Sequence, residues 1–418
     1  MSHLRNPGAG AAHLAFLALF PGFFFYHTAL GLGVIGPALG GYFSRVCLVF
    51  LPFLVFGCLA RAGRDRHFFT WADIAFFLFL SYFFFVIGFN YANGADGGLV
   101  QDHLYIILQF VTVFLIFRLA DFGAPRFQLA LFISMLAMAC LIFFVSGDGS
   151  AYIDEEAGAD TGGAASTYQG FARSYFLTCL AVLAMTTSGL MRLLIYLVSV
   201  PALFINGARS ELIALFAVIC LAEAAYARRN PLGLLTAIVL AGILLLPNTE
   251  QVMHALPDSR VLELLDLSRS TSWAGRTYYF EHALKTIGEN PILGSYGSYL
   301  QIGGRGAYAH NIFSAWVDLG LAGFFYLLCM LLVPAYKLTA CVFFRRAHER
   351  SGELVLAFCL LFATLLLLFT SKTYGEMLIA ASVGSYAHYR SASRRDSVRH
   401  GIEKLDGKAV RPRVQIEI

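Results

Sequence analysis

Charged residues are scarce in this chain, since only 13% of its 418 residues are Asp, Glu, Lys or Arg. A soluble globular domain has about 25% charged residues. Hydrophobic residues make up 58% of the chain and include 39 phenylalanines, which is more apolar surface than a soluble fold can bury. The composition therefore indicates an integral membrane protein. It excludes a disordered chain, a disulfide-framed secreted domain and a nucleic-acid-binding protein.

The sequence also lacks the cysteine spacing of a disulfide framework or a zinc site. None of its eight cysteines forms a CxxC pair, and all lie within or at the ends of apolar runs. We expect them to be small core residues. The first apolar run has no small-residue cleavage site after it, so we interpret it as a retained helix and not as a signal peptide.

Long apolar runs recur along the chain, and a membrane-spanning helix needs about 20 mostly apolar residues. The twelve predicted spans are 12–34, 44–60, 71–90, 103–120, 127–146, 171–189, 191–206, 210–227, 231–247, 312–335, 353–371 and 374–389. The sequence thus predicts an all-α polytopic membrane protein. Its transmembrane domain covers residues 1–389 and contains one long loop, 248–311, and a basic tail follows at 390–418.

Basic residues in the short loops predict the orientation of the chain. With twelve spans, the Lys- and Arg-bearing loops at 61–67, 118–126, 228–229 and 337–350 all fall on one side. The positive-inside rule makes this side the cytoplasm and places both termini there. The acidic loop 147–170, which has no Lys or Arg, and the long loop 248–311 then face outward.

The long outer loop contains a predicted amphipathic helix. Arg276, Phe280, Ala283, Leu284 and Ile287 are spaced so that they fall on one helical face, and Pro291 and Gly294 end the helix. A helix with an apolar stripe and an arginine on the same stripe is expected to lie over the membrane domain with the arginine pointing inward.

Several arginines break the positive-inside rule, because they lie at outer span ends or in the outer loop. They are Arg45, Arg173, Arg209, Arg260, Arg269, Arg276 and Arg305. Guanidinium is always charged and binds phosphate in bidentate fashion, so this cluster predicts an anionic ligand at the outer surface, such as a lipid-linked phosphate. The alternative is that each arginine reaches lipid headgroups or pairs with the acidic loop.

Two local patterns stand out within this set. Asn206-Gly207-Ala208-Arg209-Ser210-Glu211 interrupts two apolar runs. Asn-Gly is expected to end one helix and Ser210 to cap the next, so that Arg209 lies at a helix N-terminus, which favours anions. The second pattern is His310-Asn311 before the tenth span, with Asn311 as a possible N-cap. Histidine can accept a proton near neutral pH, although an exposed or interfacial histidine is the simpler interpretation. No metal ligands are spaced around it.

Taken together, these segments resemble the O-antigen ligase and polymerase superfamily, the Wzy-C family. Three ordered motifs carry the resemblance, and they are Gly207-Ala208-Arg209-Ser210, Arg276 with Pro291-Ile292-Leu293-Gly294, and His310-Asn311 with Gly320-Leu321. The likeness is good over roughly residues 190–335. The twelve spans and the large loop between the ninth and tenth also match, whereas the first five spans match only in general character. This chain has Ala208 where many members have serine.

The resemblance implies a GT-C-like membrane glycosyltransferase without a metal or other cofactor. Arg209 resembles the family arginine that binds the donor diphosphate, Arg276 resembles the second loop arginine, and His310 resembles the proposed catalytic histidine. Arg45, Arg173 and Arg305 are further candidates for diphosphate binding on position alone. The implied donor is a glycan on undecaprenyl diphosphate, and the acceptor is lipid A–core or a growing glycan, in the periplasm of a bacterial inner membrane.

Two alternatives remain beside glycosyl transfer. A lipid-linked oligosaccharide flippase or transporter also often has about twelve spans, but transporters carry ionisable groups at mid-membrane and related halves. Here Asp73, Asp318 and Glu376 lie near span ends and the halves are unalike. A non-catalytic scaffold of a polysaccharide export complex is the third possibility. The motifs do not separate ligase from polymerase.

Overall fold

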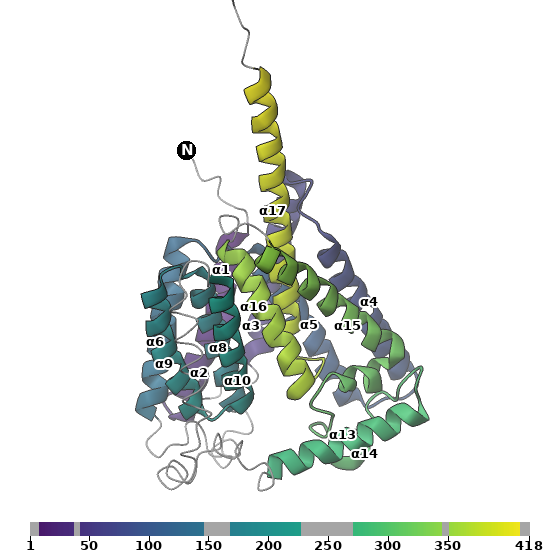
Figure 1. The fold of residues 1–418 in the computed structure, drawn as a ribbon. Coiled ribbons are helices and arrows are strands. Elements are labelled where there is room, and N and C mark those ends of the chain that lie inside the picture. Colours follow the sequence, from purple (N-terminus) through teal and green to yellow (C-terminus); the bar gives the residue numbers. More distant parts are fainter. Residues whose placement is uncertain (1–7, 37–41, 146–167, 227–270, 345–350, 410–418) are drawn as a thin grey trace, which may run out of the picture.

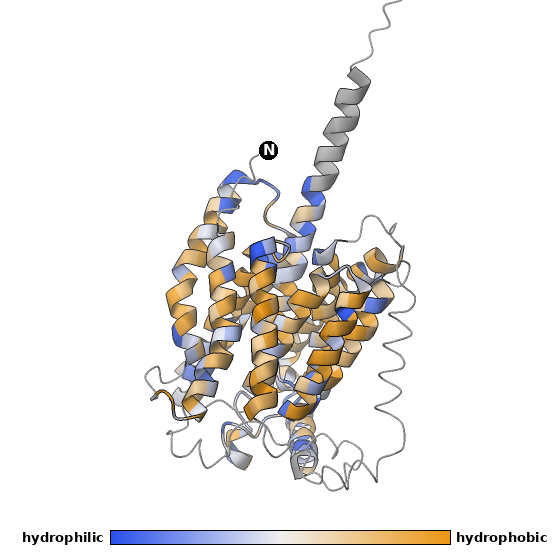
Figure 2. Cartoon of the chain, turned by 90° about the vertical axis from the view of Figure 1, so that its left-hand side faces the viewer, coloured by the Kyte–Doolittle hydropathy of each residue, from blue (hydrophilic) through white to orange (hydrophobic). Residues whose placement is uncertain are grey.

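The computed structural model describes residues 8–36, 42–145, 168–226, 271–344 and 351–409. Within these residues all regular secondary structure is helical. Eight helical segments are long and apolar enough to cross a membrane. The apolar residues cover the central part of these helices and polar residues collect toward their ends (Figure 2). The protein is therefore an α-helical, multi-pass membrane protein.

The helices follow the chain in an order that matches most of the predicted spans (Figure 1). The eight candidate spans are α1–η1–α2 (Ala9–Gly31), α3 (Tyr42–Arg64), α4 (Trp71–Ala92), α5 (Gly97–Leu119), α6 (Pro125–Val145), α9 (Gly189–Asn206), α15 (Phe313–Phe344) and α16 (Gly352–Thr370). The remaining helices are α8 (Tyr168–Met185), α10 (Arg209–Tyr226), α13 (Thr271–Glu289), α14 (Leu300–Gly303) and α17 (Leu378–Ala409). The first span contains a π-helical turn at Pro21, where the ring removes a backbone donor.

Three of the twelve predicted spans form helices that differ from ordinary lipid-facing spans. α8 is buried along almost its whole length, so it does not need a strongly apolar outer surface. α10 carries Arg209, Glu211 and Glu223 within its 18 residues. α17 is mostly polar beyond its buried first half, and it continues past residue 390, so the predicted boundary between domain and tail falls inside a helix. The predicted span 231–247 lies outside the described residues.

One end of the bundle is held together by buried and half-buried ion pairs. Arg118 of α5 binds Asp73 of α4 at 2.7 Å and also donates a hydrogen bond to Ser391 of α17. His388 of α17 approaches Glu353 of α16 at 3.3 Å. These contacts join helix ends that the basic loops had assigned to a single side of the membrane.

The opposite end carries α13 and α14, which lie across the ends of the bundle helices (Figure 1). α13 packs against α15, with Ala283 and Ile287 buried against Val317. Leu284, which the sequence assigned to the same face, is exposed instead. α13 therefore lies against the membrane domain as predicted, but with a narrower apolar stripe.

A pair of glycine turns connects α13 to α15. Gly320 has a positive φ of 68° and kinks α15 near its start. The turn that follows α13 fits into this kink, where Ser295 donates to the Val317 carbonyl at 2.7 Å. Gly294 also has a positive φ, of 71°, and a Cβ at this position would collide with the carbonyl oxygens of Val317 and Trp316. The Pro-x-x-Gly motif and the Gly-Leu motif thus pack directly against each other.

Candidate functional site

Two adjoining cavities open at the end of the bundle that carries α13. The larger has a volume of about 600 Å³, and we call it the arginine cavity. Its lining comprises Tyr168, Gln169, Gly207, Arg209, Ser210, Ile213, Trp273, Arg276, Thr277, Phe280, His310, Asn311, Ile312, Phe313, Phe369, Thr370 and Ser371. Three residues that the sequence singled out, Arg209, Arg276 and His310, therefore share one cavity although they come from three separate segments.

Arg209 reaches this cavity because the chain breaks just before it. Gly207 adopts a left-handed conformation with φ of 78° and ends α9, and α10 begins at Arg209 itself. Ser210 is thus inside the helix and does not take the cap position that the sequence predicted. Its hydroxyl donates instead to the carboxylate of Glu211, at 2.7 Å. The first turn of α10, with its partial positive charge, faces the cavity together with the arginine.

Arg276 enters from the other side, on α13. Phe280, one turn further along, packs its ring against Phe313 with centroids 5.7 Å apart, and this holds the helix over the cavity. Burial lowers the pKa of Arg276, as does the positive charge of Arg209, while Tyr168 and Glu211 act in the opposite direction. Arg276 and Arg209 are thus close enough for their charges to act on one another. A bound anion would relieve this repulsion.

His310 is held at the entry of α15. The side chain of Asn311 accepts a hydrogen bond from the Phe313 amide at 3.0 Å, so this residue caps the helix as predicted. Burial, together with the positive charges of Arg276 and Lys372, lowers the pKa of His310 from 6.5 to about 4. The imidazole is therefore neutral near pH 7 and has a lone pair with which to accept a proton.

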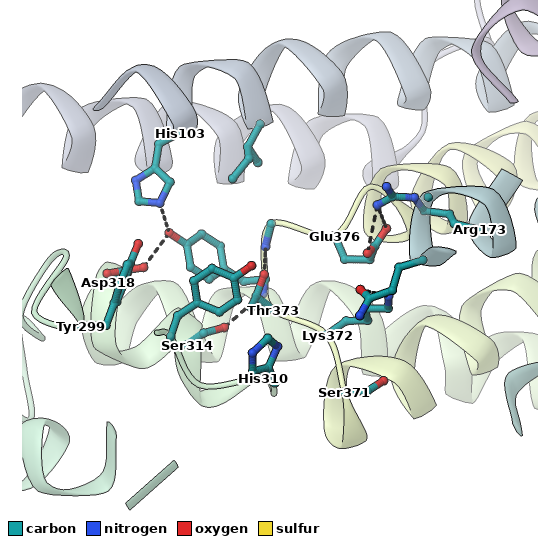
Figure 3. Close-up of a pocket in the computed structure, with 16 residues that line it drawn as sticks. His103, Arg173, Tyr299, His310, Ser314, Asp318, Ser371, Lys372, Thr373 and Glu376 are labelled. Atoms are coloured by element: carbon teal, nitrogen blue, oxygen red, sulfur yellow. Dashed lines mark hydrogen bonds and ion pairs between the residues drawn. The ribbon is translucent and has the colours of Figure 1, made fainter. Parts of the chain in front are cut away.

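The smaller cavity has a volume of about 300 Å³, and we call it the polar cavity (Figure 3). It is lined by His103, Ile106, Gln169, Gly170, Arg173, Tyr299, Tyr308, His310, Ser314, Asp318, Ser371, Lys372, Thr373, Tyr374, Gly375 and Glu376. Gln169, His310 and Ser371 line both cavities. The imidazole of His310 thus stands at the boundary between an arginine-bearing compartment and a polar one.

One side of the polar cavity is a hydrogen-bonded network of His103, Tyr374 and Asp318. The Tyr374 hydroxyl donates to Asp318 at 3.0 Å and lies 3.2 Å from a ring nitrogen of His103. The other carboxylate oxygen of Asp318 accepts from the Gly297 amide at 2.9 Å. The network joins α5, α15 and the loop before α17, so it also determines the position of that loop.

Ion pairs form the other side of the polar cavity. Arg173 of α8 binds Glu376 at 3.1 Å, and the two side chains face one another in Figure 3. Lys372 binds Glu211 of α10 at 2.7 Å. Burial acts to raise the pKa of Glu376, but Arg173 and Lys372 outweigh it and lower the pKa below its ordinary value. Glu376 is therefore a carboxylate, and the charge of Arg173 is matched within the cavity.

The other arginines expected from their position lie elsewhere. Arg173 lines the polar cavity and not the arginine cavity. Arg305 is exposed and pairs with Asp96 at 3.7 Å and Asp102 at 3.6 Å, near the start of α5. Arg45 is exposed on α3 and is not among the residues that line either cavity. Arg260 and Arg269 lie outside the described residues.

Sequence reasoning missed most of the polar cavity. Ser371-Lys372-Thr373-Tyr374-Gly375-Glu376 is a polar interruption between two apolar runs, similar in kind to the segment around Arg209, and this signal was available. His103 and Tyr308 gave no such signal, because each is one polar residue near a span end. Within the described part of the chain, no group of three His, Cys, Asp or Glu side chains could hold a metal ion.

The fold and the site define a class: an α-helical membrane protein with a cationic cavity and a polar cavity at one end of its bundle. No protein-family model and no curated protein matches the chain.

Proposed function

We propose that this protein is a membrane glycosyltransferase of the O-antigen ligase and polymerase type, with a GT-C-like arrangement of about twelve spans. The observation that carries the proposal is that Arg209, Arg276 and His310 line one cavity. The same cavity has apolar walls that include Ile213, Phe313 and Phe369. Two cations beside an apolar wall match a diphosphate joined to a polyprenyl chain.

The donor is a glycan on undecaprenyl diphosphate, and its sugar–phosphate bond is already activated. The acceptor hydroxyl attacks the anomeric carbon from the face opposite the diphosphate, a new carbon–oxygen bond forms, and the bond to phosphate breaks with inversion. Arg209 and Arg276 stabilise the charge that grows on the leaving diphosphate, a contribution on the order of 3 kcal/mol for one such contact. No metal is required for this role.

His310 accepts the proton of the attacking hydroxyl. Its lowered pKa keeps the imidazole neutral at pH 7, and positioned general-base catalysis contributes about 10²–10⁴-fold. As the diphosphate brings negative charge beside His310, the protonated form becomes easier to reach at the moment the proton is transferred. The two roles thus support each other.

The proposal includes a bacterial inner membrane with both termini in the cytoplasm. The ion-paired end with Arg118 then faces the cytoplasm, and the cavities face the periplasm, where the glycan acceptor is found. This orientation follows the excess of basic residues in the short loops at the first of these ends.

The test is glycan transfer by purified protein in liposomes without an ion gradient. We expect transfer by the wild type, and a loss of about 100-fold or more in His310→Ala and Arg209→Ala, with normal expression and folding. Arg45→Ala is the matched control, because it removes an arginine outside both cavities. Near-normal transfer by both cavity variants would refute the proposal, and gradient-dependent movement without transfer would identify a transporter.

Ligase and polymerase activities give different products in cells. Deletion of a ligase leaves long chains on the carrier lipid and removes glycan from lipid A–core. Deletion of a polymerase shortens the chains instead. Glycolipid profiles of the deletion strain therefore distinguish the two activities.

A further inference from the structure

The two cavities differ in their balance of charge. The two cations that line the polar cavity, Arg173 and Lys372, are each paired with a carboxylate, Glu376 and Glu211 respectively. The arginine cavity has Arg209 and Arg276, and no Asp or Glu of the described residues lines it. The two cations of the polar cavity are therefore balanced before any ligand enters it.

The charged groups of the polar cavity are also engaged with one another or with neighbours. Arg173 binds Glu376 at 3.1 Å, and Lys372 binds Glu211 at 2.7 Å. Asp318 accepts hydrogen bonds from Gly297 and Tyr374. A charged ligand would add an unmatched charge beside groups that are already paired, and an uncompensated charge in a buried site is unfavourable.

The rest of the lining provides neutral hydrogen-bonding groups and aromatic faces. Thr373 and Ser314 present hydroxyl groups, and Gln169 presents an amide. The rings of Tyr299 and Tyr308 meet edge to face at 5.7 Å, and Tyr308 continues to the ring of His310 at 5.1 Å. Such a mixture of hydroxyl, amide and ring surfaces suits a neutral molecule with many hydroxyl groups and an apolar ring face.

We propose that the polar cavity binds the acceptor sugar, and that it selects an uncharged sugar residue over an anionic one. This inference rests on the proposed glycosyl transfer. The hydroxyl that reacts points toward His310, which lines both cavities, and the donor diphosphate lies on the far side, with Arg209 and Arg276. Donor and acceptor thus approach the reacting carbon from opposite directions, as inversion requires.

Glu376 is the residue that sets the selection. Its carboxylate neutralises Arg173 and, within the cavity, repels an acidic acceptor. In Glu376→Gln, Arg173 loses the carboxylate that it binds, so an acidic sugar gains a partner in Arg173. A neutral sugar gains no new partner from the change. Its binding is weakened, because Arg173 is no longer held in place by the ion pair.

The experiment uses the full-length protein in proteoliposomes and radiolabelled undecaprenyl-diphosphate glycan from the producing cells. The acceptors are the glycolipid fraction of those cells and the same fraction after oxidation of its primary hydroxyls to carboxylates. We expect the wild type to prefer the unoxidised fraction by about tenfold or more, and Glu376→Gln to shift the ratio toward the oxidised fraction by about tenfold. Glu289→Gln, an equal charge change on the exposed surface of α13, should leave the ratio unchanged.

Thermal unfolding shows whether each variant folds. The shift in unfolding temperature caused by undecaprenyl diphosphate measures donor binding. We expect binding to survive in Glu376→Gln and to be lost in Arg276→Ala. If Glu376→Gln does not fold, Thr373→Val takes its place and should raise the KM for the neutral acceptor while donor binding persists. Unchanged acceptor preference in a folded Glu376→Gln, or an unchanged acceptor KM in Thr373→Val, overturns the acceptor-site inference. No transfer by the wild type with either fraction overturns the proposed function itself.

Discussion

The amide of Leu321 donates a hydrogen bond to the carbonyl oxygen of Ile292 at 3.0 Å, and this bond closes the contact between the turn after α13 and the kink of α15. Its consequence is functional, because α13 carries Arg276 and the segment before α15 carries His310. The relative position of these two side chains depends on how closely the two backbones approach at Gly294 and Gly320.

Replacing either glycine should therefore damage the site from a distance. Gly294→Ala and Gly320→Ala place a Cβ against backbone carbonyl oxygens and strain a positive φ, which alone costs about 1–2 kcal/mol. We expect a lower unfolding temperature and a marked loss of transfer per folded molecule. Gly288→Ala, in α13 with nothing within 4 Å of the new Cβ, is the control and should retain both properties. Equal behaviour of the three variants would show that the contact has no such role.

Arg305 should be dispensable for transfer although it is an arginine of the same loop. Its side chain is 57% exposed and pairs at 3.6 to 3.7 Å with Asp96 and Asp102, away from both cavities. Exposed pairs of this kind contribute about 0–1 kcal/mol. We expect Arg305→Ala to transfer glycan within about twofold of the wild type under conditions where Arg276→Ala loses on the order of 100-fold. A loss in Arg305→Ala comparable to that in Arg276→Ala would mean that the loop changes position when donor binds.

The pH dependence of transfer should report on His310. Because its pKa is lowered to about 4 in the folded protein, the free enzyme should have its basic form across the neutral range, and kcat/KM should fall only as pH drops toward 4. In the proposed mechanism the bound diphosphate raises this pKa, so kcat should begin to fall at a higher pH than kcat/KM does. Steady-state rates between pH 4 and 8 measure both profiles, and two coincident profiles would argue against the diphosphate lying beside His310.

The same titration affects stability. A histidine with pKa 6.5 when unfolded and about 4 when folded binds protons more readily in the unfolded state. The contribution of neutral His310 to the free energy of unfolding is therefore largest above pH 6.5, and it is lost as the pH falls from 6.5 toward 4. His310→Gln should lessen the decrease in unfolding temperature over this interval, which thermal unfolding at a series of pH values detects.

In the proposed mechanism Arg209 and Arg276 supply the positive charge at the leaving diphosphate, so chelation of divalent metals should leave transfer intact. We expect the same rate in EDTA as in magnesium, measured in proteoliposomes. A loss of activity in EDTA that magnesium restores would assign part of this role to a bound cation.

The pair of Arg192 and Glu223 offers a stability test far from the cavities. The two side chains are buried and 2.5 Å apart, and Glu223 also accepts a hydrogen bond from Tyr196. Removing one partner from a buried pair costs about 3–5 kcal/mol. Glu223→Gln should lower the unfolding temperature clearly, and a double variant with Arg192→Met and Glu223→Met should be less affected than Glu223→Gln alone. Transfer per folded molecule should stay normal in both.

Much of the architecture could be predicted from local sequence. Long apolar runs produce helices because a bilayer leaves backbone groups no other partners, and eleven of the twelve predicted runs coincide with helices in the described residues. The break at Gly207 and the cap at Asn311 were also predicted, because both depend on neighbours within a few residues. The prediction of Ser210 as a cap was wrong, since α10 already begins at Arg209 and Ser210 lies inside the helix.

The distinction among the arginines required the tertiary structure. Arg45, Arg173, Arg209, Arg276 and Arg305 look alike along the chain, as basic residues on the outer side. Long-range packing distinguishes them. Arg173 pairs with Glu376, and Arg305 pairs with Asp96 at the start of α5. Arg276 of α13 and Arg209 of α10 line one cavity instead.

The polar cavity also depends on packing between segments that are distant in the chain. Its network of His103, Asp318 and Tyr374 joins three segments that are more than fifty residues apart in the chain. Composition and helical periodicity report only local preferences, and they indicate a membrane protein whose arginines are predicted to lie on its outer side. Which charges meet, and which remain matched by a partner, depends on contacts between distant helices that local pattern does not encode.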